Sequence, residues 1–257
     1  MHDFLKMCLI LAPLLFLTGF VDSVAGGGGL ISLPAYLLVG LPVHLAFGTN
    51  KVVNGVGTGF AAVRYAKGGK IRFRTAICAG CGALPGAFLG ARLAMLCSDR
   101  VLKTCLLIAL PAVAAVLFLK PDFGKKEQPE KNLSPRRECV YSFLIGLVIG
   151  VYDGLIGPGT GTFMLMAFTL VLGMDLLTAS GCAKVANLAS NVASAAVWIM
   201  GGEVLWKLVL PAACCCVLGN WCGARYAIRG GSGKVRGMIF VVLALLFAKL
   251  IYEMFFK

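Results

Sequence analysis

Two lysines inside apolar stretches are the residues whose positions most strongly suggest chemistry. Lys51 and Lys184 each fall within a run long enough to cross a bilayer, where an ammonium group costs about 2.5–3.5 kcal/mol on insertion scales. We predict that these two cations receive a small anion. The alternatives are snorkelling to the interface, or pairing with Asp22 and Asp153. Hydrogen-bonding side chains lie about one helical turn from each ammonium: Thr49, Asn50 and Asn54 beside Lys51, and Asn187, Ser190 and Asn191 beside Lys184.

Two glycine-rich segments interrupt apolar runs and are predicted to be breaks in membrane helices. Backbone amides freed at a helix N-terminus carry partial positive charge and can approach an oxyanion where no side chain intervenes. Lipid cannot satisfy such amides, so the breaks should line a cavity enclosed by protein. Helix breakage with close packing is the alternative interpretation. The residues are Gly26, Gly27, Gly28 and Gly29 in one segment, and Gly157, Pro158, Gly159, Thr160 and Gly161 in the other.

Two aspartates, Asp22 and Asp153, each precede a break by four residues. An acidic side chain at this depth can relay protons or bind a coupling cation, and capping of a broken helix is an equal alternative. The cysteines lie mostly inside apolar segments, which favours packing over disulfide or metal chemistry. No histidine or carboxylate lies near Cys78 and Cys81 to complete a metal site. We therefore predict neither a metal nor another cofactor.

The elements that must position these residues are membrane helices. Of 257 residues, 59% are hydrophobic and 14% charged, with a mean hydropathy of +0.89, so the bilayer is the expected solvent. The sequence predicts an all-α polytopic membrane protein with eight long spans and two short, broken or re-entrant helices, up to ten elements. The long spans are residues 4–25, 43–66, 75–96, 101–119, 139–157, 177–200, 205–228 and 235–256; the short pieces are 30–39 and 161–172.

The chain is internally duplicated. An offset of 131 residues pairs Asp22 with Asp153, and an offset of 133 pairs Lys51 with Lys184 and keeps its register to the end. We divide the chain into a first membrane repeat, residues 1–119, a basic cytoplasmic linker, 120–138, and a second membrane repeat, 139–257. The offset also pairs two Gly-xxx-Gly motifs, Gly86 to Gly90 with Gly219 to Gly223, which we interpret as helix contacts.

The charges of equivalent loops predict that the two repeats have opposite orientations. Residues 64–74 carry five Lys or Arg, whereas the equivalent residues 197–207 carry one, and these residues accumulate on the cytoplasmic side. Both termini then face outward. The net charge of +13 lies mainly in short loops between spans, which argues against nucleic-acid binding. Tyr65 and its equivalent Trp198 are expected in interfacial belts. The lipid bilayer is an expected partner, and the sequence leaves a homodimer open.

Three stretches carry a family resemblance. They are Asp22-Ser-Val-Ala-Gly-Gly-Gly-Gly-Leu-Ile-Ser-Leu-Pro34, Gly48-Thr-Asn-Lys51 and Val151-Tyr-Asp-Gly-Leu-Ile-Gly-Pro-Gly-Thr-Gly161. The chain resembles the sulfite exporter TauE/SafE family from about Phe16 to Tyr252. The resemblance implies a secondary carrier of the bacterial inner membrane for small sulfur-containing oxyanions, such as sulfite, sulfoacetate or other organosulfonates. Matching motif positions are Gly26 to Gly29, Thr49, Lys51, Asn54, Gly157 to Gly161, Lys184 and Asn187. Ala183 departs from the repeat, because its equivalent is Asn50.

The leading hypothesis is a transporter, not an enzyme, whose two repeats rock about a central oxyanion site and expose it to each side in turn. One alternative is a cation or amino-acid carrier that uses Asp22 and Asp153. The other is a membrane thiol enzyme that uses Cys78 and Cys81, or the run from Cys214 to Cys216.

Overall fold

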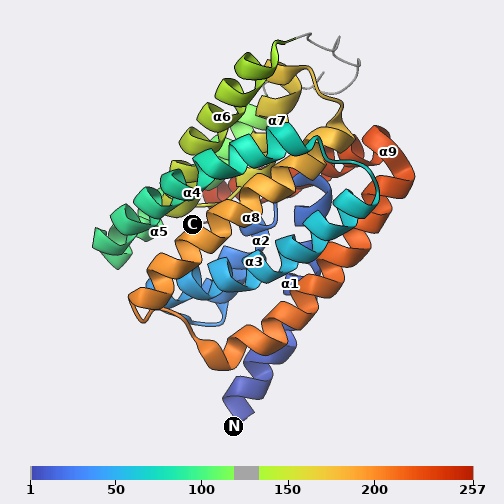
Figure 1. Ribbon diagram of the computed structural model, residues 1–257. Coiled ribbons are helices and arrows are strands. Elements are labelled where there is room, and N and C mark those ends of the chain that lie inside the picture. The colour runs from blue at the N-terminus through green and yellow to red at the C-terminus, as the bar shows by residue number, and fades with distance from the viewer. Residues whose placement is uncertain (1, 119–132, 257) are drawn as a thin grey trace.

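The computed structural model describes residues 2–118 and 133–256, which form nine helices and no strand (Figure 1). This confirms the predicted all-α class. The helices are α1 (His2–Ala25), α2 (Gly29–Leu38), α3 (Val43–Lys67), α4 (Phe73–Leu96), α5 (Asp99–Phe118), α6 (Pro135–Leu155), α7 (Thr160–Leu172), α8 (Leu176–Met200) and α9 (Trp206–Phe256).

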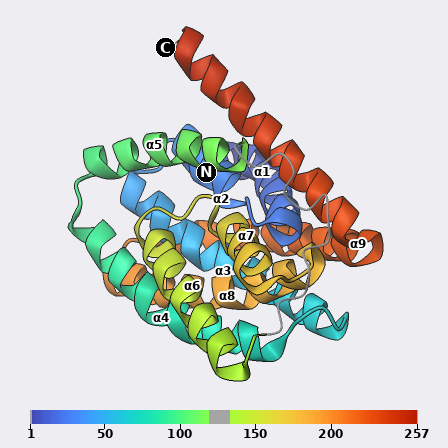
Figure 2. The same cartoon turned by 90° about the horizontal axis from the view of Figure 1, so that it is seen from above.

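The last two predicted spans, 205–228 and 235–256, both lie in α9, where two helices meet at a kink at Gly231. Helix α9 covers both, with a single non-helical residue, Gly231 (φ 67°, ψ −168°). The segment between the predicted spans is short and contains no proline, so one glycine with positive φ is enough to redirect the helix. Beyond this point Val235 and Ile239 are still buried in the core, and only the C-terminal end of α9 extends away from the other helices (Figure 2).

Most of the predicted linker, residues 120–138, falls on residues 119–132, outside the described part of the chain. Its last residues correct the prediction, because α6 begins at Pro135 and not at Cys139. Ser134 Oγ accepts a hydrogen bond from the backbone N–H three residues on, at 3.5 Å. A serine N-cap followed by proline is a strong helix start. Glu138 is thereby buried in α6, where it accepts a hydrogen bond from Thr75 Oγ1 at 2.5 Å.

Four helical stretches of the described chain are long and apolar enough to cross a membrane: Phe4–Ala25, Phe73–Leu96, Pro135–Leu155 and Trp206–Val241. Helices α3 and α8 are equally long, with 25 residues each, but they carry polar side chains along their buried faces. Helices α2 and α7 are short, with 10 and 13 residues. The chain is therefore a multi-pass membrane protein in which the polar helices α3 and α8 pack against each other and against apolar helices, α8 against α4 and α3 against α9. Figure 2 shows these helices from above.

Glycines hold the outer helices close together. Helix α4 packs along α6, and α1 packs along α9. A Cβ added at Gly86 would overlap the α6 backbone, and one added at Gly219 or Gly223 would overlap the backbone of α1 near Phe20. The prediction that the two Gly-xxx-Gly motifs are helix contacts is confirmed, since only a residue without a side chain permits this approach.

The expectation of an interfacial belt at Tyr65 and Trp198 is wrong, because both side chains are fully buried. The loop after α3 folds back over α8, so that the carbonyl oxygen of Lys70 lies against Gly181. Beneath this loop the Tyr65 hydroxyl donates to the Ser23 carbonyl oxygen at 2.9 Å. Hydropathy places a residue near the end of a helix, but it does not show that a loop covers that end.

Candidate functional site

The two helix breaks meet each other at the centre of the molecule. Gly26 follows α1 with φ 79° and Gly157 follows α6 with φ 92°, and such backbone conformations favour glycine. The backbone of Gly26 packs directly against that of Gly161, so that a Cβ at either position would overlap the other segment. Thr162 Oγ1 joins the breaks by donating to the Ala25 carbonyl oxygen at 2.8 Å.

Each lysine forms an ion pair with the aspartate of the other repeat. Lys51 Nζ lies 2.8 Å from Asp153 Oδ2 and 2.5 Å from the Asp153 carbonyl oxygen. Lys184 Nζ lies 2.8 Å from Asp22 Oδ2 and 2.6 Å from the Asp22 carbonyl oxygen. All four side chains are at least nine-tenths buried. Pairing, which the sequence left open as an alternative, is the arrangement in this conformation, and the four charges sum to zero.

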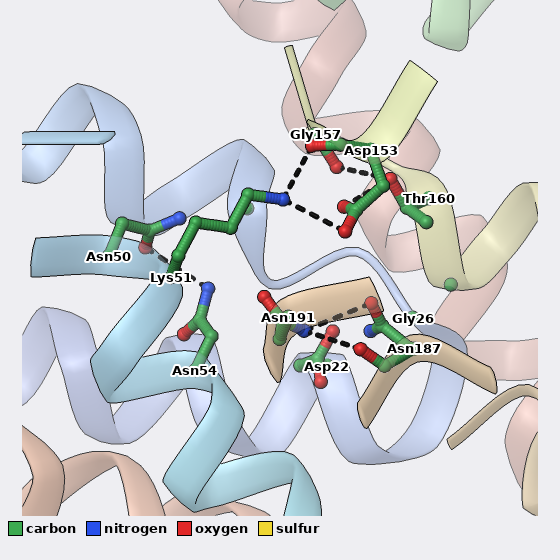
Figure 3. A pocket seen from close by; sticks show the side chains of 12 residues that line it. Asp22, Gly26, Asn50, Lys51, Asn54, Asp153, Gly157, Thr160, Asn187 and Asn191 are labelled. Atoms are coloured by element: carbon green, nitrogen blue, oxygen red, sulfur yellow. Dashed lines mark hydrogen bonds and ion pairs between the residues drawn. The ribbon is translucent and has the colours of Figure 1, made fainter. Parts of the chain in front are cut away.

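A buried polar pocket lies between the two breaks and the facing sides of α3 and α8 (Figure 3). Its volume is about 20 Å³, which is room for about one water molecule. Every lining residue was a candidate from the sequence. The lining consists of Asp22, Gly26, Gly29, Asn50, Lys51, Asn54, Asp153, Gly157, Thr160, Gly161, Asn187 and Asn191.

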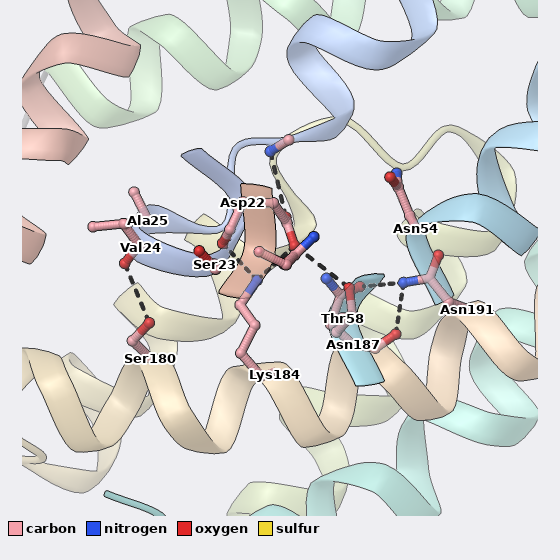
Figure 4. A network of polar contacts seen from close by, with 12 residues as sticks. Asp22, Ser23, Val24, Ala25, Asn54, Thr58, Ser180, Lys184, Asn187 and Asn191 are labelled. Carbon is pink, nitrogen blue, oxygen red and sulfur yellow. Dashed lines mark hydrogen bonds and ion pairs between the residues drawn. The ribbon is translucent and has the colours of Figure 1, made fainter. Parts of the chain in front are cut away.

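Six of the predicted site residues do not line this pocket: Gly27, Gly28, Thr49, Pro158, Gly159 and Lys184. Thr49 Oγ1 instead accepts a hydrogen bond from the backbone N–H of Leu205, at 3.0 Å. The backbone N–H of Gly28 donates to Asp22 Oδ1 at 3.4 Å. Lys184 reaches Asp22 from α8 (Figure 4). These residues support the site without facing the cavity, and only one of the two lysines lines it.

The four asparagines form two pairs, each one helical turn apart. Asn54 Nδ2 donates to Asn50 Oδ1 at 3.0 Å on α3. Asn191 Nδ2 donates to the Asn187 carbonyl oxygen at 2.8 Å and lies 3.1 Å from Asn187 Oδ1 on α8. Each side-chain amide has two N–H donors, so Asn54 keeps one N–H that this pairing does not use. The facing sides of α3 and α8 thus present side-chain amides to the cavity.

The aspartates are held by further hydroxyl groups. Asp153 Oδ1 accepts from Thr160 Oγ1 at 2.8 Å, and Asp153 Oδ2 accepts from Ser190 Oγ at 2.7 Å. Asp22 Oδ2 lies 3.4 Å from Thr58 Oγ1 (Figure 4). Thr58 is not among the residues predicted from the sequence. Its position in the sequence could have identified it, because Thr58 follows Asn54 by one helical turn and is the repeat equivalent of Asn191.

The cysteines give one correction. Cys78 was interpreted as a packing residue, but the structure joins it to Cys139 in a disulfide between α4 and α6. The physical reason is the glycine packing nearby, where Gly146 lies against the Ala79 backbone. This approach brings the two Cα atoms within 5.4 Å, inside the range that a disulfide spans. Cys78 is therefore not paired with Cys81. Among the described residues, no group of three His, Cys, Asp or Glu could hold a metal.

Apolar helices around a buried polar pocket define the class as a multi-pass helical membrane protein with a polar centre. Comparison with known proteins gives the family: the sulfite exporter TauE/SafE model matches residues 11–250. The chain belongs to this family of membrane transporters. It is 36% identical over 238 residues to the probable membrane transporter protein ORF9 of Sinorhizobium sp, covering 93% of this chain and 90% of the relative.

Other relatives have similar descriptions. A probable membrane transporter protein of Haemophilus influenzae is 31% identical over 238 residues, 93% of this chain and 92% of the relative. The probable membrane transporter protein YfcA of Escherichia coli (strain K12) is 29% identical over 253 residues, 97% of this chain and 93% of the relative. No solved structure matches the chain.

Proposed function

We propose that the protein is a secondary transporter that moves small sulfur-containing oxyanions, such as sulfite, sulfoacetate or another organosulfonate, across the cell inner membrane by alternating access. The main support for this proposal is the composition of the central pocket. It brings the ammonium of Lys51, the amide side chains of α3 and α8, and the glycine-rich breaks of both repeats around one buried cavity. This is a donor-rich set of the kind that binds an oxyanion.

Reciprocal contacts between the halves support an inverted duplication. Gly48 packs against the Glu203 carbonyl oxygen, and its repeat equivalent Gly181 packs against the Lys70 carbonyl oxygen. The swapped lysine–aspartate pairs follow the same rule, because each half supplies the cation for the carboxylate of the other. Two halves that contact each other through equivalent residues can exchange conformations, which is the basis of alternating access in inverted repeats.

The ion pairs suggest how an anion is admitted. A second negative charge beside Asp153 is unfavourable while this carboxylate is ionised, because like charges repel strongly in a buried site. A proton taken up by Asp153 would neutralise this carboxylate and free the Lys51 ammonium, which then needs a new anionic partner. The oxyanion would supply it. In this scheme Asp153, and Asp22 in the equivalent pair, couple the movement of protons to that of the substrate.

The small volume of the pocket fits an occluded conformation. At about 20 Å³ the cavity holds about one water molecule, whereas sulfite has four heavy atoms. Binding therefore requires the repeats to separate at the crossing of Gly26 and Gly161. Movement of one repeat against the other would open the cavity to one side and close it to the other.

A cation or amino-acid carrier is the second candidate, because both Asp22 and Asp153 line the cavity while only one lysine does. A metal cation would use the carboxylates directly and would repel Lys51. An amino acid would use both charges. The two candidates differ in the sign of the ligand charge that the pocket accepts.

A thermal-shift screen of the purified protein distinguishes these candidates. Sulfite, sulfate, thiosulfate and organosulfonates are tested against Na⁺, K⁺ and neutral amino acids at matched ionic strength. A ligand at 100 times its dissociation constant stabilises the folded state by about 2.7 kcal/mol. We expect stabilisation by at least one sulfur oxyanion, and loss of this effect in Lys51→Gln. Stabilisation only by cations or amino acids would refute the proposed substrate class.

A further inference from the structure

A second cavity lies at the end of α3, away from the central pocket. It occupies about 400 Å³ between the end of α3 and the middle of α9. Four cations line it: Arg64 and Lys67 from α3, and Arg225 and Arg229 from α9. This is the face to which the loop charges assign the cytoplasm. The proposed transport function makes no use of these residues.

The four cations have no acidic partner in the described part of the chain. Among the residues whose side chains the structure describes, no carboxylate lies within 4.0 Å of any of them. Arg64 is stacked on Trp221 with 4.2 Å from Cζ to the ring centroid, a geometry that holds the guanidinium in place. Its Nε is buried and makes no hydrogen bond. A buried, unpartnered donor next to three further cations indicates a site for an anionic oxygen-bearing group such as a phosphate.

The fold itself does not require these charges, because the equivalent residues of the two repeats make the same helix contact without them. Gly201 packs against Met95, as Gly68 packs against Ile228 at the basic cavity. The offset of 133 residues places Val197, Met200 and Leu96 where the basic groove has Arg64, Lys67 and Arg229. Only Arg92 remains, as the equivalent of Arg225. One groove has therefore gained three cations that its structural equivalent lacks.

The surroundings of the basic cavity are apolar and outward-facing. Phe60 lies one turn before Arg64 on α3 and is 47% exposed; Leu218 lies nearly one turn before Trp221 on α9 and is 58% exposed. Such side chains face lipid in a membrane, and tryptophan favours the level of the headgroups. The cavity thus combines a cluster of cations with an apolar path along the same two helices. An anionic phospholipid has this combination of a phosphate and an acyl chain.

We propose that the groove between α3 and α9 is a binding site for an anionic phospholipid, with the phosphate held by Arg64, Lys67, Arg225 and Arg229 and an acyl chain lying along Phe60 and Leu218. Basic pockets between membrane helices on the cytoplasmic side bind anionic headgroups in this way. A bound lipid would fasten α3, which carries Lys51, to α9.

The experiment measures quenching of Trp221 fluorescence by lipids brominated on the acyl chain. The full chain carries Trp206→Phe, because Trp206 is also exposed, whereas Trp198 is buried. Brominated dioleoyl phosphatidylglycerol is compared with brominated dioleoyl phosphatidylcholine in detergent micelles. We expect preferential quenching by phosphatidylglycerol. In Arg225→Gln/Arg229→Gln the preference should fall about fivefold for each cation removed. Arg92→Gln, in the equivalent groove, should leave it unchanged.

Two results overturn the proposal. Equal quenching of the parent protein by the two lipids shows that the groove does not select a negative headgroup, and it does so without reference to any variant. A preference that survives Arg225→Gln/Arg229→Gln places the anionic lipid elsewhere. Inorganic phosphate is added in a further arm at constant ionic strength. Displacement of brominated phosphatidylglycerol by phosphate assigns the cations to a soluble oxyanion and contradicts the lipid assignment.

Discussion

The replacement of Asp153 by asparagine tests the buried ion pairs with a magnitude that the structure sets. The side chains of Lys51 and Asp153 are 3% and 4% exposed. Asparagine keeps one oxygen that accepts from the hydroxyl group of Thr160 or of Ser190, and the other hydroxyl can rotate to accept from the new NH2 group, so the change removes mainly the negative charge. Loss of one partner from such a buried pair costs about 3–5 kcal/mol, because the other charge stays buried and uncompensated. For a chain of this size, the apparent melting temperature should fall by roughly 6–20 °C.

The assay is thermal unfolding of purified variants in one detergent. Asp153→Asn, Lys51→Met and the double variant Lys51→Met/Asp153→Asn form a double-mutant cycle with the parent. Removing both charges should recover at least half of the loss, because no unpaired charge remains. Asp99→Asn is the control: Asp99 pairs with His44 but is 52% exposed, so its loss should cost about 1 kcal/mol or less. A melting temperature for Asp153→Asn within about 2 °C of the parent, less than 1 kcal/mol on this scale, would refute the reasoning, as would strictly additive losses.

Three further predictions concern the pocket and its support. Gly26→Ala should lower the free energy of unfolding by about 2–5 kcal/mol and abolish flux, because a Cβ overlaps Gly161 at a strained positive φ. The control is Gly40→Ala, where φ is 85° and the space around the residue is open. Its free energy of unfolding, measured in the same way, should fall by only about 1–2 kcal/mol. Tyr65→Phe removes a hydrogen bond to an α1 carbonyl group, and thermal unfolding should show a loss of about 1–3 kcal/mol; an unchanged melt would mean that water replaces the bond. Asn54→Asp adds a negative charge to the pocket and should weaken binding of a sulfur oxyanion at least tenfold, equal to about 1.4 kcal/mol, as calorimetry would detect; tighter binding would favour the cation carrier.

Much of the pocket could be predicted because several of its residues are polar or charged but lie inside apolar spans. A lysine or an asparagine inside an apolar span is costly, and positions such as Lys51 and Asn187 therefore stand out without a structure. Duplication gave a second signal, since an equivalent residue such as Lys184 appears at a fixed offset. The remaining lining residues, such as Gly29 and Thr160, were found because they belong to glycine-rich segments that interrupt apolar spans.

The pairing could not be predicted in the same way. Whether Lys51 is free or bound to Asp153 depends on distances of a few ångströms between different repeats, and residue type contains no such information. The disulfide of Cys78 and Cys139 could not be predicted for the same reason, because it depends on how closely glycines let α4 and α6 approach. The basic cavity needed the structure as well. Arg64 and Arg225 belong to different repeats, and residue type does not show that they line one cavity.

The proposed binding site is tested by measuring sulfite and sulfoacetate flux into proteoliposomes that contain the parent protein, Lys51→Gln or Arg92→Gln at equal density. Orientation and insertion are checked in each preparation. We expect flux in the parent and in Arg92→Gln, and none above empty liposomes in Lys51→Gln. Undiminished flux in Lys51→Gln would contradict the claim that the pocket between the crossed helix breaks is where the transported anion binds.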